Sequence, residues 1–145
     1  MKTDQFLTAP YSAESEASVL SALLLDNDAI HHIPDLTAEN FYTERYADVF
    51  RAIRALAAVG KPADIITVFE QLQQAGRPQA LADLHALAQY VPSASNLRRY
   101  AEIVQGKHQS RALMKAAAEI NDLAMQPGSA AEQIDAAQMK LAKLA

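Results

Sequence analysis

The chain has 145 residues, half of them apolar, which is enough for one compact domain or for a domain with a helical appendage. The absence of cysteine excludes disulfides, thiolate nucleophiles and cysteine-ligated zinc, and the net charge of −4 argues against a dedicated nucleic-acid-binding protein. The polar first residues and the short apolar runs predict neither a signal peptide nor a membrane span, so we expect a cytoplasmic protein without membrane contact.

The charge is distributed unevenly along the chain. Residues 1–48 hold nine acidic residues against two basic ones, a net charge of −7. Residues 49–95 carry +1 and residues 96–145 carry +2. Head-to-tail contact between subunits is one interpretation; two differently charged, solvated faces are the other, which we favour.

The first helix is predicted to begin after Ser12, a suitable N-cap, with Glu14 and Glu16 in the first turn, where the helix dipole favours anions. Residues 26–28, Asp-Asn-Asp, end it. Its apolar face is formed by Ala17, Val19, Leu20, Leu23 and Leu24. A short helix, 29–33, is expected to stop before Pro34, and a turn follows from Thr37 to Tyr42.

Three further helices are predicted before residue 95. The clearest ends at Gly60, has charged residues opposite its apolar face, and carries Tyr46, Val49, Phe50, Ile53, Leu56 and Ala57. The next is capped by Asp64, ends at Gly76, and carries Ile65, Val68, Phe69 and Leu72. The last stops before Pro92 and carries Leu81, Leu84, Leu87 and Ala88.

A longer helical pattern begins near Ser95. Gly106 lies inside it and is a point where the helix can bend, because a mid-helix glycine costs about 1 kcal/mol relative to alanine. Pro127-Gly128 should end this helix, and Ser129 and Glu132 form a capping box for the next one. The last helix has apolar residues at alternating steps of four and three, as in a coiled coil. We expect an antiparallel pair of helices joined by a two-residue turn.

The predicted fold is therefore all-α. A globular head of about six short helices occupies residues 12–94, and a helical hairpin for dimerisation and partner docking occupies residues 95–145. Residues 1–11 are expected to form a disordered or flexible N-terminal arm.

The hairpin carries the candidate interaction surface. Two helices alone make a thin core, so we expect the hairpin to dock on a second copy or on a partner; the alternative is that it folds back onto the head. The predicted interface consists of Leu113, Ala116, Ile120, Leu123, Ile134, Ala137, Leu141 and Leu144.

No motif for catalysis, cofactor binding or metal binding is visible. Gly60-Lys61 and Gly106-Lys107 lack the other residues of a P-loop. The four histidines have no metal-site spacing, and no nucleophile elbow is present. We therefore predict no catalytic, cofactor-binding or metal-binding residues. An enzyme with an unrecognised site is an alternative hypothesis, and it would require a pocket with converging polar groups.

One basic concentration lies in the long helix: Arg98, Arg99, Lys107, Arg111 and Lys115. Weak contact with single-stranded DNA is one interpretation. We favour a solvated face, or one that pairs with the acidic front of a neighbour, and therefore expect little or no direct DNA binding.

Three blocks in order resemble the N-terminal domain of DnaB-type replicative helicases. They are PYSAESEASVLSALLLDNDAI from Pro10, NFYTERYADVFRAIRALAAVGKPADIITVFEQLQQAG from Asn40, and VPSASNLRRYAEIV from Val91. The resemblance spans roughly residues 10 to 105 and implies a helical head followed by a hairpin. Departures from the family pattern include Ser21, where glycine is common, and Asp83, where an aromatic is often found.

The resemblance implies a non-catalytic collar domain that associates as dimers, or as a hexamer built as a trimer of dimers, and that docks the C-terminal domain of primase. A helicase loader is a further expected partner. ATP and Mg²⁺ are implied only for a motor domain, which we expect beyond a linker after Ala145. The alternative is a free-standing decoy, inhibitor or loader of the same fold, which a reading frame continuing into a P-loop ATPase would contradict.

Overall fold

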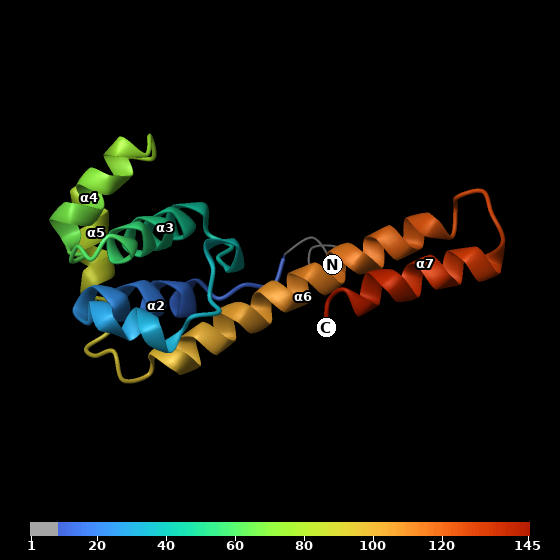
Figure 1. The fold of residues 1–145 in the computed structure, drawn as a ribbon, viewed down its shortest axis with the longest axis horizontal. Helices are drawn as coiled ribbons and strands as arrows, with labels where there is room; N and C mark the ends of the chain where they lie inside the picture. The colour runs from blue at the N-terminus through green and yellow to red at the C-terminus, as the bar shows by residue number, and fades with distance from the viewer. Residues whose placement is uncertain (1–8) are drawn as a thin grey trace, which may run out of the picture. The chain divides into compact units, whose positions relative to one another are not determined.

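A computed structural model describes residues 9–145, and every regular element in that range is helical (Figure 1). In chain order the elements are α2 (Ala13–Leu25), η1 (Asn27–His32), η2 (Ala38–Asn40), α3 (Glu44–Ala58), α4 (Ile65–Gln74), α5 (Leu81–Ala88), α6 (Leu97–Leu123) and α7 (Ala130–Ala142). The two η elements are 3₁₀ helices. The predicted fold class is confirmed: six short helices precede an antiparallel pair of helices.

The described residues divide into two compact units. Residues 11–105 form the head unit, and residues 106–145, with the described residues before Tyr11, form the hairpin unit. The division falls inside α6, which continues through Gly106 without interruption. The predicted head ended at residue 94, but Leu97, Ala101 and Val104 of α6 are also buried in the head core. Residues 1–8 of the predicted arm lie outside the described residues.

Every helix of the head unit contributes side chains to its core, and α2 is buried on all sides from Ser15 to Leu23. The ring centroids of Phe41, which follows η2, and of Phe50, in the middle of α3, lie 5.1 Å apart. The apolar side chains that are less than 2% exposed are Val19, Leu20, Ala22, Leu23, Leu36, Val49, Phe50, Ile53, Val68, Leu72, Leu84 and Val104. Most belong to the predicted apolar faces, because helical spacing places residues three and four apart on one side.

Helix ends follow the predicted capping chemistry. Ser12 accepts a hydrogen bond from Ser15 N–H at 3.1 Å, and Asp64 accepts one from Thr67 N–H at 2.8 Å. Gly60 and Gly76 have φ of 70° and 73°, a left-handed conformation that glycine adopts without strain. These two glycines therefore end α3 and α4 as predicted.

A buried carboxylate caps a helix distant in the sequence. Glu16 in α2 is 1% exposed, and its two carboxylate oxygens accept the backbone N–H groups of Tyr42 and Thr43 at 2.8 and 3.1 Å. Thr43 is the N-cap residue of α3 but makes no capping bond with its own side chain. Glu16 thus satisfies donors that would otherwise be left open at the start of α3.

Two more polar side chains tie segments of the head unit together. Ser21 Oγ donates to Ala88 O at 3.3 Å and accepts from Val91 N–H at 3.1 Å, which joins α2 to the end of α5. Asn27 donates to Leu23 O and Ala63 O, both at 2.9 Å, and accepts from Ala63 N–H at 2.8 Å. A serine at position 21 therefore has a structural reason, since glycine could form neither of the bonds made by its hydroxyl.

Candidate interaction surface on the hairpin

The helical part of the hairpin unit consists of the second part of α6, the whole of α7, and a connection of residues 124–129 (Figure 1). The predicted two-residue turn is therefore wrong. Helix α6 ends at Leu123, four residues before Pro127. The chain then continues in turns, in which Met125 N–H donates to Asp122 O. Gly128 has φ of 135°, a conformation that side-chain-bearing residues rarely adopt.

Polar contacts hold the two helices of the hairpin. Lys140 Nζ on α7 lies 3.3 Å from Glu119 Oε1 on α6. Near the connection, Gln133 Nε2 donates to Gln126 O at 2.8 Å. Because both side chains of the ion pair are more than one-third exposed, the pair contributes little to the stability of the hairpin.

The predicted capping box at the start of α7 is confirmed. Ser129 Oγ accepts from Glu132 N–H at 3.1 Å, and Glu132 Oε1 accepts from Ser129 N–H at 3.1 Å. The Ser129 backbone N–H, followed by the Ser129 hydroxyl, lowers the pKa of the Glu132 carboxyl below its ordinary value. The ionised glutamate is the form that accepts both bonds.

The eight residues of the predicted interface lie in three environments. Ala116 is buried, at 5% exposure. Four are partly buried: Ile120, Leu123, Ala137 and Leu144. Leu113, Ile134 and Leu141 are 53%, 57% and 45% exposed. Ile134 and Leu141, seven residues apart, share one face of α7, so this chain alone leaves an apolar face of the hairpin in water.

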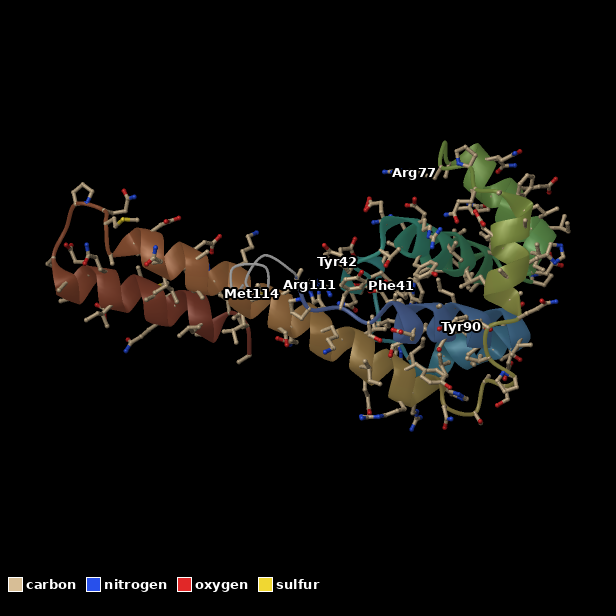
Figure 2. All side chains as sticks on the ribbon, turned by 180° about the vertical axis from the view of Figure 1, so that it is seen from behind. Phe41, Tyr42, Arg77, Tyr90, Arg111 and Met114 are labelled. Atoms are coloured by element: carbon tan, nitrogen blue, oxygen red, sulfur yellow. The ribbon has the colours of Figure 1, made fainter. Side chains whose placement is uncertain are left out.

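Three methionines of the hairpin unit also expose much of their side chains. Met114 is 41% exposed, Met125 72% and Met139 63% (Figure 2 labels Met114 on α6). Met139 lies five positions after Ile134, which at 100° per residue places the two about 140° apart around α7. These methionines fall outside the predicted coiled-coil repeat, so periodicity alone did not identify them.

The basic side chains of α6 lie in different surroundings. Arg99 pairs with Glu102 at 3.5 Å, with both side chains largely exposed. Arg111, labelled in Figure 2, donates to Pro10 O at 2.9 Å. Two of the five predicted basic residues are thus engaged within the chain, and the others lie at exposed or partly exposed positions.

Neither a metal-ligand cluster nor a membrane-spanning helix is found among the described residues. Within residues 9–145, no three histidine, aspartate or glutamate side chains are grouped so that they could hold a metal ion. The same range has no helix of the length and apolarity needed to cross a membrane. The carboxyls with a lowered pKa, Asp64 and Glu132, both owe the change first to a backbone N–H at a helix N-terminus. These shifts are explained by helix capping and indicate no catalytic group.

Comparison with known proteins identifies the fold. The crystal structure of the N-terminal domain of DnaB helicase from Mycobacterium tuberculosis superimposes with a TM-score of 0.86 at 34% identity, covering 95% of this chain and all of that one. A DnaB-like replicative helicase, described with its interactions with primase, matches at a TM-score of 0.75 and 19% identity, over 92% of this chain and 32% of that one. The architecture is thus that of a replicative-helicase N-terminal domain.

Sequence comparison gives the family. Residues 8–106 match the family described as the DnaB-like helicase N terminal domain. The replicative DNA helicase DnaB of Buchnera aphidicola is 33% identical over 123 residues, which are 82% of this chain and 27% of that protein. That of Geobacillus stearothermophilus is 36% identical over 118 residues, 77% of this chain and 25% of that protein. This chain belongs to the DnaB-like helicase N-terminal domain family, and it spans about a quarter of the length of these curated relatives.

Proposed function

We propose that this chain acts as the non-catalytic collar domain of a replicative DNA helicase, where it joins subunits and docks the primase C-terminal domain. The single observation that carries the proposal is the exposed apolar face of the hairpin, on which Ile134 and Leu141 are about half exposed. Burying such side chains in a subunit contact contributes about 25 cal/mol for each Å² of apolar surface removed from water. A dimer, or a trimer of dimers in a longer protein, would bury this face.

The association part of the proposal is tested by matched substitutions on α7. Ile134→Asp places a carboxylate on the face proposed to be buried, whereas Met139→Asp makes the same kind of change on the opposite side of the helix. We expect Ile134→Asp to weaken self-association at least about 30-fold, because an unpaired charge is costly to bury. Met139→Asp should change it less than about threefold.

Sedimentation equilibrium measures both variants, with circular dichroism as a control for folding. If Ile134→Asp and Met139→Asp leave the same mass distribution as the unmodified chain, the proposed use of this face is wrong. Equal weakening by the two variants would also contradict it, because that result would show no preference between the faces of α7.

The primase part is tested by titration with the cognate primase C-terminal domain. Its support is the family membership, together with the relative whose solved structure is described with primase. Isothermal titration should show a complex that Leu113→Asp or Leu141→Asp weakens and that Met139→Asp does not. Absence of any complex at high micromolar concentrations would refute primase docking, and a helicase loader would be tested next in the same format.

In this proposal the chain itself does not catalyse DNA unwinding. ATP and Mg²⁺ bind to the motor domain that the family resemblance implies. The present chain supplies only contacts between proteins. We further propose that the present chain works in the cytoplasm and contacts DNA little or not at all. Its net charge of −4 supports that reading, because DNA affinity depends mostly on neutralising phosphates.

A further inference from the structure

A groove runs along the solvent side of α3 in the head unit. On one side, a cavity of about 440 Å³ is bounded by residues 34–39 and α3. On the other, a cavity of about 320 Å³ is bounded by α3 and α4. The two cavities share Arg51 and Ala55, so we treat them as one surface, the α3 groove. Its floor includes Ala52, Ala55 and Ala58, whose short side chains leave space between the longer side chains around them.

The α3 groove is locally cationic on an acidic unit. Residues 11–105 contain seven arginines and lysines against twelve acidic residues, a net charge of −5. Three of those seven cations line the groove, Arg51, Arg54 and Arg77, with only Asp48 and Glu39 of the twelve acids. Figure 2 shows Arg77 on the turn that follows α4. The groove therefore carries a net positive charge on a unit whose net charge is negative.

Two of the arginines are held in place before any ligand arrives. Arg51 Nη1 lies 2.9 Å from Asp48 Oδ1, which neutralises a carboxylate that is only 10% exposed. Arg54 Nη2 donates to Leu36 O at 2.9 Å, and its guanidinium lies 5.0 Å from the centre of the Phe50 ring. The Nε of Arg54 is buried without a hydrogen-bond partner. A guanidinium fixed in this way loses little further entropy when it binds a carboxylate.

The lining of the groove is apolar in part and polar in part. Leu36, Phe50 and Ala58 line the larger cavity, and Leu72 and Ala75 line the smaller one. The combination of an apolar trough with a few arginines matches an amphipathic segment that carries both apolar and acidic side chains. It does not match a nucleic acid strand, because no exposed aromatic ring lines the groove to stack on bases and the unit as a whole repels a polyanion.

We propose that the α3 groove binds an acidic, amphipathic peptide segment of a partner protein. An apolar side chain of that segment occupies the larger cavity beside Phe50. The carboxylates of the same segment pair with Arg51, Arg54 and Arg77. This site lies in the head unit, so it is additional to the association surface proposed on the hairpin. Arginine–carboxylate pairs supply specificity through paired hydrogen bonds, and the apolar anchor supplies most of the burial.

The test uses the 145-residue chain and a designed probe. The probe is a fluorescein-labelled peptide of about 16 residues, roughly 24 Å long as a helix, with leucines on one face and glutamates on the other. A second peptide replaces every glutamate by glutamine, and a third replaces every leucine by serine. Fluorescence anisotropy should show binding of the first peptide only, with an affinity that falls as salt is added.

Two single substitutions on α3 locate the site. Ala55→Glu places a carboxylate at the exposed position shared by both cavities, whereas Ala57→Glu places one at an exposed position of the same helix that lines neither. Both keep a good helix former at a solvent position, so the fold should be retained. We expect Ala55→Glu to weaken probe binding at least about tenfold and Ala57→Glu less than about twofold.

Amide shifts in a nuclear magnetic resonance spectrum show where the probe binds. The inference requires that the shifts gather on residues 34–39, α3 and the end of α4. It is overturned if the acidic probe does not bind, if the glutamine peptide binds equally well, if Ala55→Glu leaves binding unchanged, or if the shifts gather on α7. It is also overturned if a thymidine oligonucleotide, and not the acidic peptide, shifts the groove residues.

Discussion

The head unit and the hairpin unit bury the apolar side chains of their helices to different extents. Leu20, Phe50 and Val68 in the head unit are fully buried. Among the described residues of the hairpin unit, Ala116 alone is buried, and α7 has no buried residue at all. The difference teaches that helical periodicity reveals an apolar face without revealing what covers it. In the head unit other helices of the chain cover that face; in the hairpin unit we infer that another molecule does.

The largest expected effect on stability lies in the core of the head unit, and it distinguishes that unit from the hairpin unit. Phe50→Ala should lower the free energy of unfolding by about 3–5 kcal/mol, because it removes a fully buried ring and leaves a cavity. Ile134→Ala, at a position 57% exposed, should change it by less than about 1 kcal/mol when the chain is dilute. Urea denaturation measures both. Similar losses for the two variants would remove the distinction between the units.

The remote cap of α3 should give the next largest effect. Glu16→Gln should destabilise the head unit by about 1.5–3 kcal/mol, since the charged acceptor of the two N–H groups of Tyr42 and Thr43 is lost. Glu14→Gln is the matched control, because Glu14 lies in the same first turn of α2 but is exposed, and it should cost less than about 0.5 kcal/mol. Equal costs in urea denaturation would show that the helix dipole of α2, and not the cap of α3, explains the role of Glu16.

A smaller loss is expected at Ser21. Ser21→Ala should cost about 1–2 kcal/mol, because the buried bond from Val91 N–H to the serine hydroxyl loses its acceptor. Ser18→Ala removes only a bond from the serine hydroxyl to Glu14 O within α2, and about 0.5 kcal/mol or less is expected. The same denaturation assay compares them. A cost for Ser21→Ala no greater than that for Ser18→Ala would show that α2 and α5 do not depend on this bridge.

The smallest effect is electrostatic and lies at the start of α7. The pKa of Glu132 is lowered in the folded chain, so its contribution to stability is present above the pKa of the unfolded chain, about 4.3, and is lost as the pH falls through the lower folded value. A carbon-13 titration should place its midpoint below that of an ordinary glutamate. Ser129→Ala should move the midpoint up, while the midpoint of Asp64 stays in place. An ordinary midpoint for Glu132 in the unmodified chain would contradict the capping box.

Local chemistry explains which parts of the fold could be predicted. Ser12, Asp64 and Gly60 act on residues within five positions, so the sequence pattern contains the whole interaction. The same holds for the capping box of α7. The two-residue turn was wrong because Pro127-Gly128 is a strong turn signal that does not reveal how far upstream the helix has already ended.

Contacts between distant residues could not be predicted in the same way. Glu16 was interpreted through the dipole of its own helix, whereas its carboxylate caps a helix that begins 28 residues later. Asn27 was interpreted as part of a helix stop, and its bonds to Ala63 join the start of η1 to the loop between α3 and α4. At the candidate surface, periodicity identified Ile134 and Leu141, but it could not distinguish these exposed residues from the buried Ala116.

Hydrogen exchange at two protein concentrations tests the central claim most directly. The claim is that the head unit is held by its own core and that α7 is held by association. On dilution from the associated to the dissociated range, the amides of α7 should exchange faster, while those of α2 and α3 keep their protection. The account would be contradicted if α7 were protected as strongly as α3 and its protection did not change with concentration.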